Sequence, residues 1–271
     1  MAPHVRVLNY EATELVDPYV RYLDYFEAYI YTPEEYRRDR NEFNWDSAAI
    51  EVSYKAAQRH FSAIARDQNE ILTRRHDVAI FEGCVKQFLH LDTFKLSFHE
   101  TQHEKYFWFA NRVFIDWKDS FSLHLETMMK ALRSAQVQGF SIQTIEVYGF
   151  YAGLGKNHTD LLALASECLM GISKIKLVDS FSLLHFLAGI HLESLQQIDL
   201  VNCGLIVSDL DKFIQRQKVS LKTVRLERVL VYGGAGPLSP HLRVLESALS
   251  QLSYSHRGLL SSREITMEIL I

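Results

Sequence analysis

The sequence predicts an α/β fold in which parallel strands, repeated along the chain, form one sheet backed by helices. The first observation is that residues 195–205 read LQQIDLVNCGL and match the pattern L-x-x-L-x-L-x-x-N/C-x-L at every fixed position. The second is that the first six positions recur, with other apolar residues in place of some leucines, at 91–96, 142–147, 172–177 and 221–226. One match would be weak, whereas this series indicates a repeat architecture.

The spacing of the matches fits one kind of repeat. First positions at 142, 172, 195 and 221 are 30, 23 and 26 residues apart, in or beside the range of about 20–29 residues for leucine-rich repeats. The step from 91 to 142 is 51 residues, about two repeats, so one strand is expected to be missing or replaced by a loop there. The ninth position varies between matches. The predicted fold is therefore a degenerate leucine-rich-repeat solenoid of the ribonuclease-inhibitor type.

The pattern also assigns the two faces of the predicted sheet. Positions four and six are apolar and point to the same side of an extended segment, where we expect helices. Position five, between them, points to solvent, and it is charged in every match: Lys95, Glu146, Lys176, Asp199 and Arg225. A single repeat cannot bury its apolar side, but stacked repeats can, as a parallel sheet backed by helices.

The part of the chain before the repeats is predicted to hold a first strand and helices. Residues 5–10 place apolar side chains at positions one, four and six, which predicts a strand. Residues 15–31 carry aromatic residues three or four apart, which predicts a helix with a half-buried aromatic stripe or, alternatively, a ligand box. Residues 32–47 are charged and predict a loop, and amphipathic patterns predict helices at 48–74 and 76–88.

After residue 91, helices and strands alternate, apart from an irregular stretch at 99–123. Within it, 106–117 is rich in aromatic residues, which predicts either core packing or an exposed patch for a partner. The predicted helices are 123–137, 159–170, 182–189, 208–217 and 241–252. The predicted strands that follow them are 142–148, 172–178, 195–201, 221–227 and 264–269. We therefore expect one domain over 1–271, in which 1–90 holds the first strand and the N-terminal helices and 91–271 the degenerate repeats.

Composition and charge favour an intracellular protein without nucleic-acid or membrane partners. A net charge of −4 and a pI of about 6.3 give no support for binding to polyanions or anionic membranes. The three cysteines, Cys84, Cys168 and Cys203, form no C-x-x-C pair, and their odd number argues for a reducing compartment. The sequence shows no signal peptide and no apolar run long enough for a membrane span. The predicted location is the cytoplasm or the nucleus.

A metal-binding motif, His99-Glu100-x-x-His103, competes with this prediction. In H-E-x-x-H two histidines one helical turn apart bind zinc, and the glutamate is the general base of a peptidase. Glu126, 23 residues after His103, would be the third ligand. The motif directly follows an apolar alternation at 94–98, which predicts a strand where a peptidase needs a helix. A solvated loop is the preferred interpretation, no metal or cofactor is expected, and a zinc-dependent peptidase is the alternative function.

Other enzyme motifs are incomplete. The run 153–156, GLGK, fails as a phosphate-binding loop, because Phe150 stands where the first glycine is needed and Asn157 where Ser or Thr is needed. The chain has no G-x-S-x-G element for a hydrolase nucleophile. Cys203, at position nine of its repeat, is predicted to point inward and bond to the turn backbone rather than react. The chain is therefore predicted not to be an enzyme.

Several segments together resemble a known family. They are a first strand like 5–10, a tyrosine-rich helix, and a long helix with an Asp-Gln pair at 67–70 (DQNE). A strand of the Leu-Ser-Phe type at 96–98 and repeats that end like 195–205 follow. This combination is similar to the region after the F-box in ascomycete fungal F-box/leucine-rich-repeat proteins. The resemblance implies a role like that of a ubiquitin ligase adaptor, the recognition of a protein substrate. No F-box segment precedes Val5, so binding of the Skp1 adaptor is not expected, and only the recognition half is implied. A scaffold or decoy protein is a further alternative.

The outward strand positions are the candidate binding surface, because positions three, five and seven of stacked strands line one face, the concave one in this architecture. The residues expected to bind a partner are Lys95, Glu146, Tyr148, Lys174, Lys176, Asp199, Arg225 and Glu227. Their alternating charge favours one shaped protein epitope over a polyanion, although they could equally form a solvated face with cross-strand charge pairs. The predicted function is a non-catalytic protein–protein interaction module, whose partner binds on this face or at 106–117.

Overall fold

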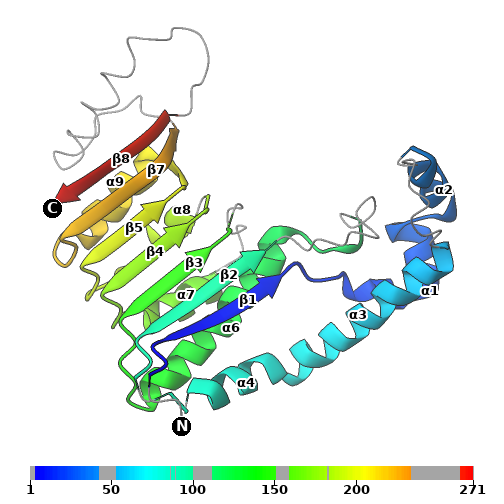
Figure 1. Ribbon diagram of the computed structural model, residues 1–271, viewed down its shortest axis with the longest axis horizontal. Helices are drawn as coiled ribbons and strands as arrows, with labels where there is room; N and C mark the ends of the chain where they lie inside the picture. The colour runs from blue at the N-terminus through cyan, green and yellow to red at the C-terminus, as the bar shows by residue number, and fades with distance from the viewer. Residues whose placement is uncertain are drawn as a thin grey trace, which may run out of the picture.

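The computed structural model describes two regions of the chain (Figure 1). One is a sheet with helices along it, here called the body. The other is a helical arm, made of residues 14–42, 53–74 and 112–116, that extends away from the sheet. The residues described by the structure are 4–42, 53–85, 87–88, 90–99, 112–150, 159–181, 183–232 and 263–270.

The sheet of the body contains eight strands among the described residues, in the order β1-β2-β3-β4-β5-β7-β6, with β8 paired to β7. All strand pairs are parallel except β7 with β8. The strands are β1 (Val7–Thr13), β2 (Thr93–His99), β3 (Thr144–Tyr148), β4 (Lys174–Val178), β5 (Gln197–Val201), β6 (Gly204–Ile206), β7 (Thr223–Tyr232) and β8 (Arg263–Leu270). The predicted α/β fold with a largely parallel sheet backed by helices is thus confirmed.

The strand register follows the repeat pattern. The residues at position four are lateral neighbours across six parallel strands: Leu8, Phe94, Ile145, Ile175, Ile198 and Val224. β2 pairs directly with β3, so no described residue of the long step forms a strand between them, in line with the prediction. The last strand differs from the expected parallel array, because β8 runs antiparallel along β7. An antiparallel neighbour needs no crossover connection, so the repeat period does not constrain its direction.

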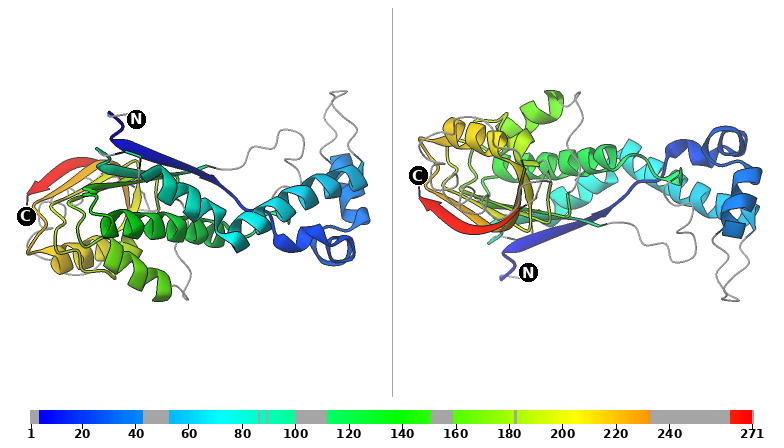
Figure 2. Two further views of the ribbon diagram at one scale, coloured as in Figure 1. Left: turned by 90° about the horizontal axis from the view of Figure 1, so that it is seen from below. Right: turned by 90° about the horizontal axis from the view of Figure 1, so that it is seen from above.

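One face of the sheet is covered by helices (Figure 2). The buried apolar side chains of the strands belong to the same core cluster as those of these helices. The helices are α4 (His76–Val85), α6 (Trp117–Val137), α7 (Thr159–Cys168), α8 (Leu183–Leu187) and α9 (Val207–Gln217). Phe94, Ile198 and Val224 are fully buried in this layer, at 0% exposure. Burial of such side chains is the main term that stabilises the body, at about 25 cal/mol per Å² of apolar surface.

The same turn conformation follows β3, β4 and β5. It also occurs in the middle of β7, at Arg228. The residue at position eight of each repeat has a left-handed backbone, with φ of 76°, 49°, 53° and 53° at Gly149, Asp179, Asn202 and Arg228. The N–H groups of the first three donate to the position-seven carbonyl of the next strand, over 2.8–3.0 Å. Gly, Asn and Asp adopt this conformation at least cost, so the residue types after β3, β4 and β5 fit the turn, whereas Arg228 in β7 adopts it at a higher cost.

The arm has its own apolar cluster, separate from that of the body. Its helices are η1 (Pro18–Arg21), α1 (Leu23–Tyr25), η2 (Phe26–Ile30), α2 (Pro33–Glu42) and α3 (Tyr54–Arg74). The cluster contains Val16, Val20, Phe26, Tyr31, Tyr36, Ala57, Phe61, Ala65 and Val113. The single helix predicted at 15–31 is therefore three short ones. Tyr22 has extended backbone angles that separate η1 from α1, and η2 is a π turn closed by Tyr31 N–H on the Phe26 carbonyl at 2.8 Å.

The loop predicted at 32–47 is wrong for its first part, which forms α2. Thr32 and Glu35 make a reciprocal capping box: the Thr32 N–H donates to Glu35 Oε2 at 3.0 Å, and the Glu35 N–H donates to Thr32 Oγ1 at 3.1 Å. Pro33 occupies the first helical position, where its missing N–H costs nothing. These local start signals outweigh the high charge on which the loop prediction relied. Residues 43–47 lie outside the described chain.

The aromatic stretch 106–117 is described only from residue 112 onward. Val113 is fully buried in the arm cluster, and Phe114 packs against it. Arg112 donates to a carboxylate of α2 at 3.0 Å. The described end of the stretch therefore packs as arm core. The predicted helix 241–252 lies outside the described residues.

Candidate protein-binding face

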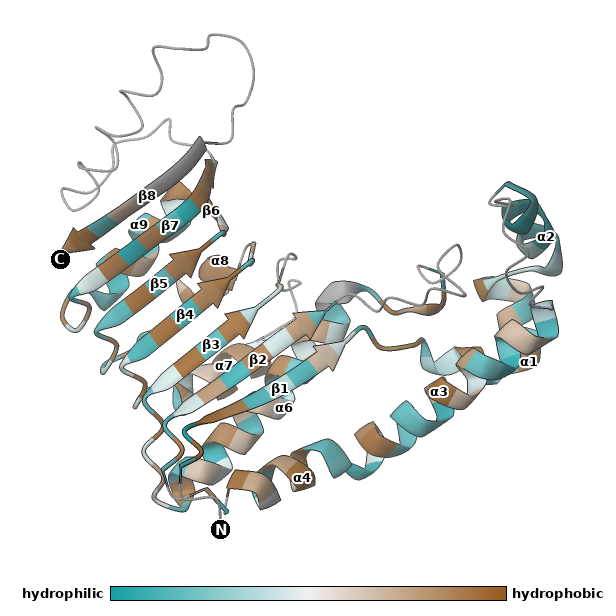
Figure 3. Cartoon of the chain, in the orientation of Figure 1, coloured by the Kyte–Doolittle hydropathy of each residue, from teal (hydrophilic) through white to brown (hydrophobic). Residues whose placement is uncertain are grey.

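The face of the sheet opposite the helices is here called the open face. No helix of the described residues covers it. Hydrophilic and hydrophobic bands alternate along β3, β4, β5 and β7 (Figure 3), because successive strand residues point to opposite sides. Along β3 and β4, the inward residues are buried and the outward ones are half-buried. The alternation thus separates a dry apolar layer from a polar surface.

A row of charged side chains crosses the middle of the open face. Lateral pairing puts one residue of every strand except β6 in this row, six of them charged and the first, Asn9, neutral: Asn9, Lys95, Glu146, Lys176, Asp199, Arg225 and Glu268. From β2 to β8 the sign alternates at every step. Cross-strand pairs of opposite charge contribute about 0.2–1 kcal/mol each, and like pairs cost similar amounts. The row therefore stabilises the sheet that presents it.

Asp199 has the densest contacts in this row. Its carboxylate lies 2.8 Å from Lys174 Nζ and accepts a 2.7 Å hydrogen bond from Gln197 Nε2. Asp199 is 7% exposed, so these donors compensate for the water that it has lost. At the far end of the row, Arg225 Nε lies 3.3 Å from Glu268 Oε1.

Tyr148 is the aromatic centre of the face. Its hydroxyl donates to Glu146 Oε2 at 2.9 Å, and the Lys95 Nζ lies 4.1 Å from the ring centroid. Burial, and then the hydrogen bond to Glu146, raise the pKa of the Tyr148 hydroxyl. Burial alone would lower the pKa of the Lys176 ammonium, but the Tyr148 hydroxyl and nearby carboxylates outweigh it and raise that pKa. Tyr148 therefore stays neutral and Lys176 stays positively charged, and both side chains are held by these contacts.

An apolar stripe runs beside the charged row. Tyr148, Val178 and Val201 are lateral neighbours on β3, β4 and β5, and each is half-buried. Ser97 and Glu227 continue the stripe at its two ends with polar groups. The open face thus has a small apolar centre bordered by hydrogen-bonding and charged groups.

All eight residues predicted for the binding surface lie on the open face, since they alternate with the buried positions of β2, β3, β4, β5 and β7. The prediction left out Asn9 and Glu268, which extend the charged row into β1 and β8. Asn9 occupies position five of the first predicted strand, so the same rule would have found it. Glu268 enters through antiparallel pairing, for which the repeat pattern gives no signal.

The residues of the zinc alternative are only partly described. His99 is the last residue of β2 and is exposed, so the first histidine of the motif lies in a strand and not in a helix. Glu126 lies on α6, where it pairs with Lys130. Glu100 and His103 lie outside the described residues. In the part of the chain that the structure describes, no three histidine, cysteine or acidic side chains form a group that could hold a metal ion.

Cys203 behaves as predicted for position nine. It is 3% exposed, and its Sγ donates to the carbonyl oxygens of Val201 at 3.2 Å and Leu177 at 3.4 Å. Burial raises the pKa of the Cys203 thiol to about 11. A buried thiol that stays protonated is a poor nucleophile, so this cysteine has a structural role.

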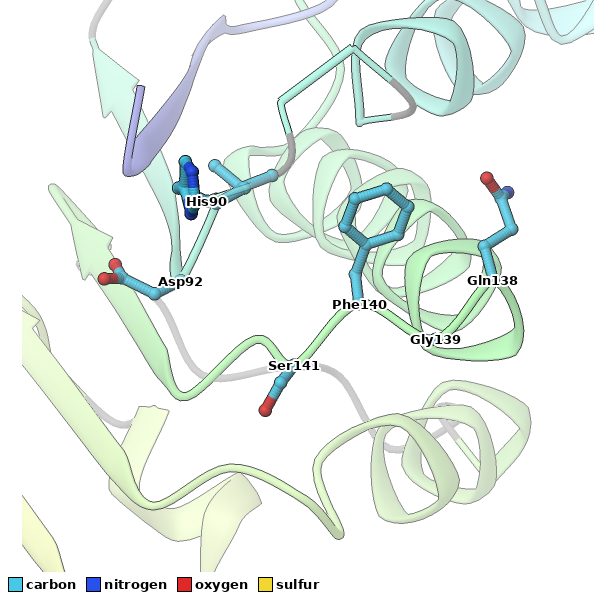
Figure 4. Close-up of a pocket in the computed structure, with 7 residues that line it drawn as sticks. His90, Asp92, Gln138, Gly139, Phe140 and Ser141 are labelled. Carbon is cyan, nitrogen blue, oxygen red and sulfur yellow. The ribbon is translucent and has the colours of Figure 1, made fainter. Parts of the chain in front are cut away.

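A hollow of about 470 Å³ lies before the first residues of β2 and β3 (Figure 4). Its lining includes His90, Asp92, Gln138 and Ser141, but the polar side chains point in different directions. Ser141 Oγ accepts a hydrogen bond from the Gln143 side chain at 2.6 Å and is directed to its own loop. Ligand sites need polar groups that converge, and this hollow has none.

The chain matches no protein-family model and no curated protein sequence. Among the described helices, none combines the length and apolar character that crossing a membrane would require. The sheet and its open face are therefore the features of the molecule that bear on its function.

Proposed function

We propose that the chain is a non-catalytic protein-recognition module with a degenerate leucine-rich-repeat architecture, whose open face binds one protein partner. In this proposal it corresponds to the recognition half of an F-box/leucine-rich-repeat-like protein. The observation that carries it is the apolar stripe Tyr148-Val178-Val201 beside a row of alternating charge. The architecture is supported by the register, in which position four of every match lies beside its counterpart on the next strand.

The stripe has the composition of a small interface centre. Protein interfaces concentrate binding energy in a few aromatic and apolar anchors that a partner can desolvate, with polar groups around them. Tyr148 supplies a ring held by Glu146 and two lysines, so little side-chain entropy remains to be lost when a partner covers it. Val178 and Val201 add apolar area without a charge that would have to be desolvated.

The charged row supplies specificity in this proposal. Because its signs alternate, it attracts neither a polyanion nor a polycation as a whole. A partner with opposite charges in the same order gains at every step, whereas a partner displaced by one strand meets like charges at every step. The row therefore favours one partner in one register.

The test introduces charge into the stripe. Val178→Arg/Val201→Arg places two guanidinium groups on the outward side of β4 and β5, where they stay in water and the fold persists. Affinity purification from the source cells, followed by mass spectrometry, identifies partners of the natural chain. Each partner is then purified and titrated against both proteins. We expect the double variant to bind at least about a hundredfold more weakly, the usual effect of removing an interface anchor.

The matched control is Val137→Arg/Val219→Arg, which adds the same charge at exposed apolar positions elsewhere, 82% and 88% exposed. It should bind like the natural chain. A partner that binds all three proteins equally contradicts the assignment of the face. A turnover of substrate by the purified chain, or zinc held in stoichiometric amount and lost in His103→Ala, contradicts the non-catalytic role.

A further inference from the structure

The arm presents an exposed cluster of aromatic side chains, here called the tyrosine patch. It comprises Tyr19, Tyr22, Leu23, Tyr25 and Tyr29, with exposed fractions of 53%, 50%, 42%, 38% and 77%. The patch lies on η1, α1, η2 and the turn between them, on the part of the arm that extends away from the sheet (Figure 2). Single exposed apolar residues are ordinary, whereas exposed apolar residues that are grouped together are typical of interaction sites.

Three rings of the patch pack against one another in a tilted arrangement. The centroids of Tyr19 and Tyr25 are 5.0 Å apart with an angle of 34° between the ring planes, and those of Tyr25 and Tyr29 are 5.0 Å apart at 42°. Ring pairs at such distances attract each other beyond simple burial. Three tyrosines thus form one continuous platform.

The backbone beneath the platform fixes it in place. Val20 and Phe26, on the inner side of the same turns, are fully buried against the arm cluster. The Asp17 carboxylate accepts the Tyr19 N–H at 2.8 Å, and the π turn η2 is closed from Tyr31 to Phe26 at 2.8 Å. π turns are rare and are frequent at functional sites. A platform fixed in advance loses little entropy when a ligand binds.

The segment 17–29, which carries the platform, is acidic. Asp17, Asp24 and Glu27 oppose the single cation Arg21, which gives a net charge of −3 + 1 = −2 over 17–29. Within the described residues, neither Asp24 nor Glu27 has an ion pair. Unpaired carboxylates favour a cation over a phosphate as the ligand of this segment.

The arm itself shows how a cation sits on its tyrosines. The Arg21 guanidinium carbon lies 4.7 Å from the Tyr22 ring centroid, and that of Arg112 lies 5.0 Å from the Tyr31 centroid. Arginine stacks on aromatic faces and pairs with carboxylates at the same time. Tyr29, at the end of the row of rings and 77% exposed, with Asp24 and Glu27 close in sequence, offers both contacts to an incoming guanidinium.

We infer that the tyrosine patch docks an arginine-bearing segment of a partner protein. A guanidinium stacks on the exposed rings and pairs with a carboxylate of the patch, and an apolar neighbour in the segment contacts Leu23. This site is separate from the open face, so it stands or fails independently of the function proposed above. A partner that spans both surfaces would bind more tightly than either site alone allows.

The test uses the full chain and a display library of random dodecapeptides, selected on the natural protein with counter-selection on Tyr25→Ser/Tyr29→Ser. Enriched peptides should share arginine beside an aliphatic residue. A synthetic consensus peptide is then titrated against purified variants. We expect the tyrosine double variant to bind about tenfold or more weakly, and Asp24→Asn/Glu27→Gln to bind more weakly and to lose most of the salt dependence.

Val137→Ser/Val219→Ser is the matched control, since it removes exposed apolar side chains from the body and leaves the patch intact. It should bind the consensus peptide like the natural chain. Thermal unfolding of each variant, expected to match that of the natural chain, shows that the exposed substitutions leave the fold intact. The inference is overturned if no peptide is enriched, if the consensus lacks a basic residue, or if the tyrosine double variant binds the consensus peptide at full strength.

Discussion

The body and the arm are both built around apolar clusters, but different forces fix their geometry. In the body, each strand takes its place because apolar residues recur at fixed positions and can be buried only in one register. A slip of one residue would turn Ile198 to the open face and Asp199 into the apolar layer, away from Lys174 and Gln197. The same pattern of buried apolar positions therefore fixes the strand register in every repeat.

In the arm, individual side-chain hydrogen bonds hold irregular turns together. Tyr31 donates to Asp39 at 3.0 Å, and the Tyr54 hydroxyl donates to the Tyr31 carbonyl at 2.6 Å. Gln58 Nε2 donates to the Val20 carbonyl at 3.3 Å. Each contact occurs once and joins a different pair of segments of the arm. The structure of the arm depends on these individual hydrogen bonds, so a single substitution can unfold part of it. The body should unfold only when its buried apolar layer is disturbed.

The largest effect is expected from Ile198→Asp. Ile198 is fully buried between sheet and helices, and an unpaired carboxylate there costs several kcal/mol, comparable to the stability of a domain. The body should unfold, as seen by loss of the cooperative transition in urea followed by circular dichroism. Thr223→Asp adds the same charge on the open face of β7 and should cost less than about 1 kcal/mol. A normal transition for Ile198→Asp would contradict the register.

A smaller loss is expected from Gly149→Ala, at the turn after β3. Gly149 has a φ of 76°, and a Cβ atom there would lie 2.0 Å from the Phe98 carbonyl oxygen. The left-handed backbone and the clash together should cost on the order of 3 kcal/mol. Gly139 is the matched control, with a φ of 85° and no neighbouring atom within 4 Å of the position that an alanine methyl would take, so Gly139→Ala should cost about 1 kcal/mol. Equal losses in urea unfolding would show that the turn backbone can shift.

The difference between body and arm also explains what the sequence could predict. The strands, their register and the face of each outward residue follow from apolar periodicity, which one sequence displays directly. Cys203 could be assigned for the same reason, as a fixed position in a repeat. Helix ends were harder to predict: α6 begins at Trp117, six residues before the predicted start at 123, because an aromatic run has high strand propensity until tertiary packing overrides it.

The remaining features of the fold depend on local hydrogen bonds or on strand pairing that no sequence period predicts. The capping box at Thr32 and Glu35 was visible in the sequence, and it outweighs charge as a signal. The π turn η2 has no sequence signature of its own, and neither does the antiparallel direction of β8. The exposed tyrosine platform was predicted as a half-buried stripe, because periodicity alone does not reveal that the helix breaks at Tyr22.

A moderate effect confined to the arm is expected from Asp39→Ala. Asp39 is 6% exposed, accepts the Tyr31 hydroxyl at 3.0 Å, and pairs with Arg38 at 3.1 Å and Arg112 at 3.2 Å. Its loss leaves these donors unpaired and should cost about 2–3 kcal/mol. Amide hydrogen exchange should quicken in α2 and η2 while the strands keep their protection.

The control for that experiment is Glu34→Ala, which removes an ion pair with Arg37 in which both side chains are about 70% exposed, at 72% and 69%. Exposed pairs contribute little, so exchange in the arm should stay unchanged. If Asp39→Ala quickened exchange equally in β3, β4 and β5, the arm and body would unfold as one unit, and the contrast drawn between them would fail.

The smallest effect is a pH dependence at the junction of β1 and α6. His124 is 8% exposed; its Nδ1 lies 2.7 Å from the Tyr10 hydroxyl and its Nε2 lies 3.0 Å from the Thr13 carbonyl oxygen. Burial lowers the pKa of His124 below its ordinary value of 6.5, although the Thr13 carbonyl and Asp77 oppose this. The folded state therefore favours neutral His124, with Nε2–H donating to Thr13 and Nδ1 accepting from Tyr10.

It follows that the unfolded chain takes up a proton at His124 at a higher pH than the folded chain does. Stability is complete above about pH 6.5 and falls as the pH drops from there toward the folded pKa, with a slope of at most about 1.4 kcal/mol per pH unit from this residue. Urea unfolding at a series of pH values measures the slope. It should flatten in His124→Gln and persist in His185→Gln, whose side chain is 71% exposed beside Asp209. A slope that His124→Gln leaves intact would assign the acid sensitivity to another titratable group and contradict the role of His124.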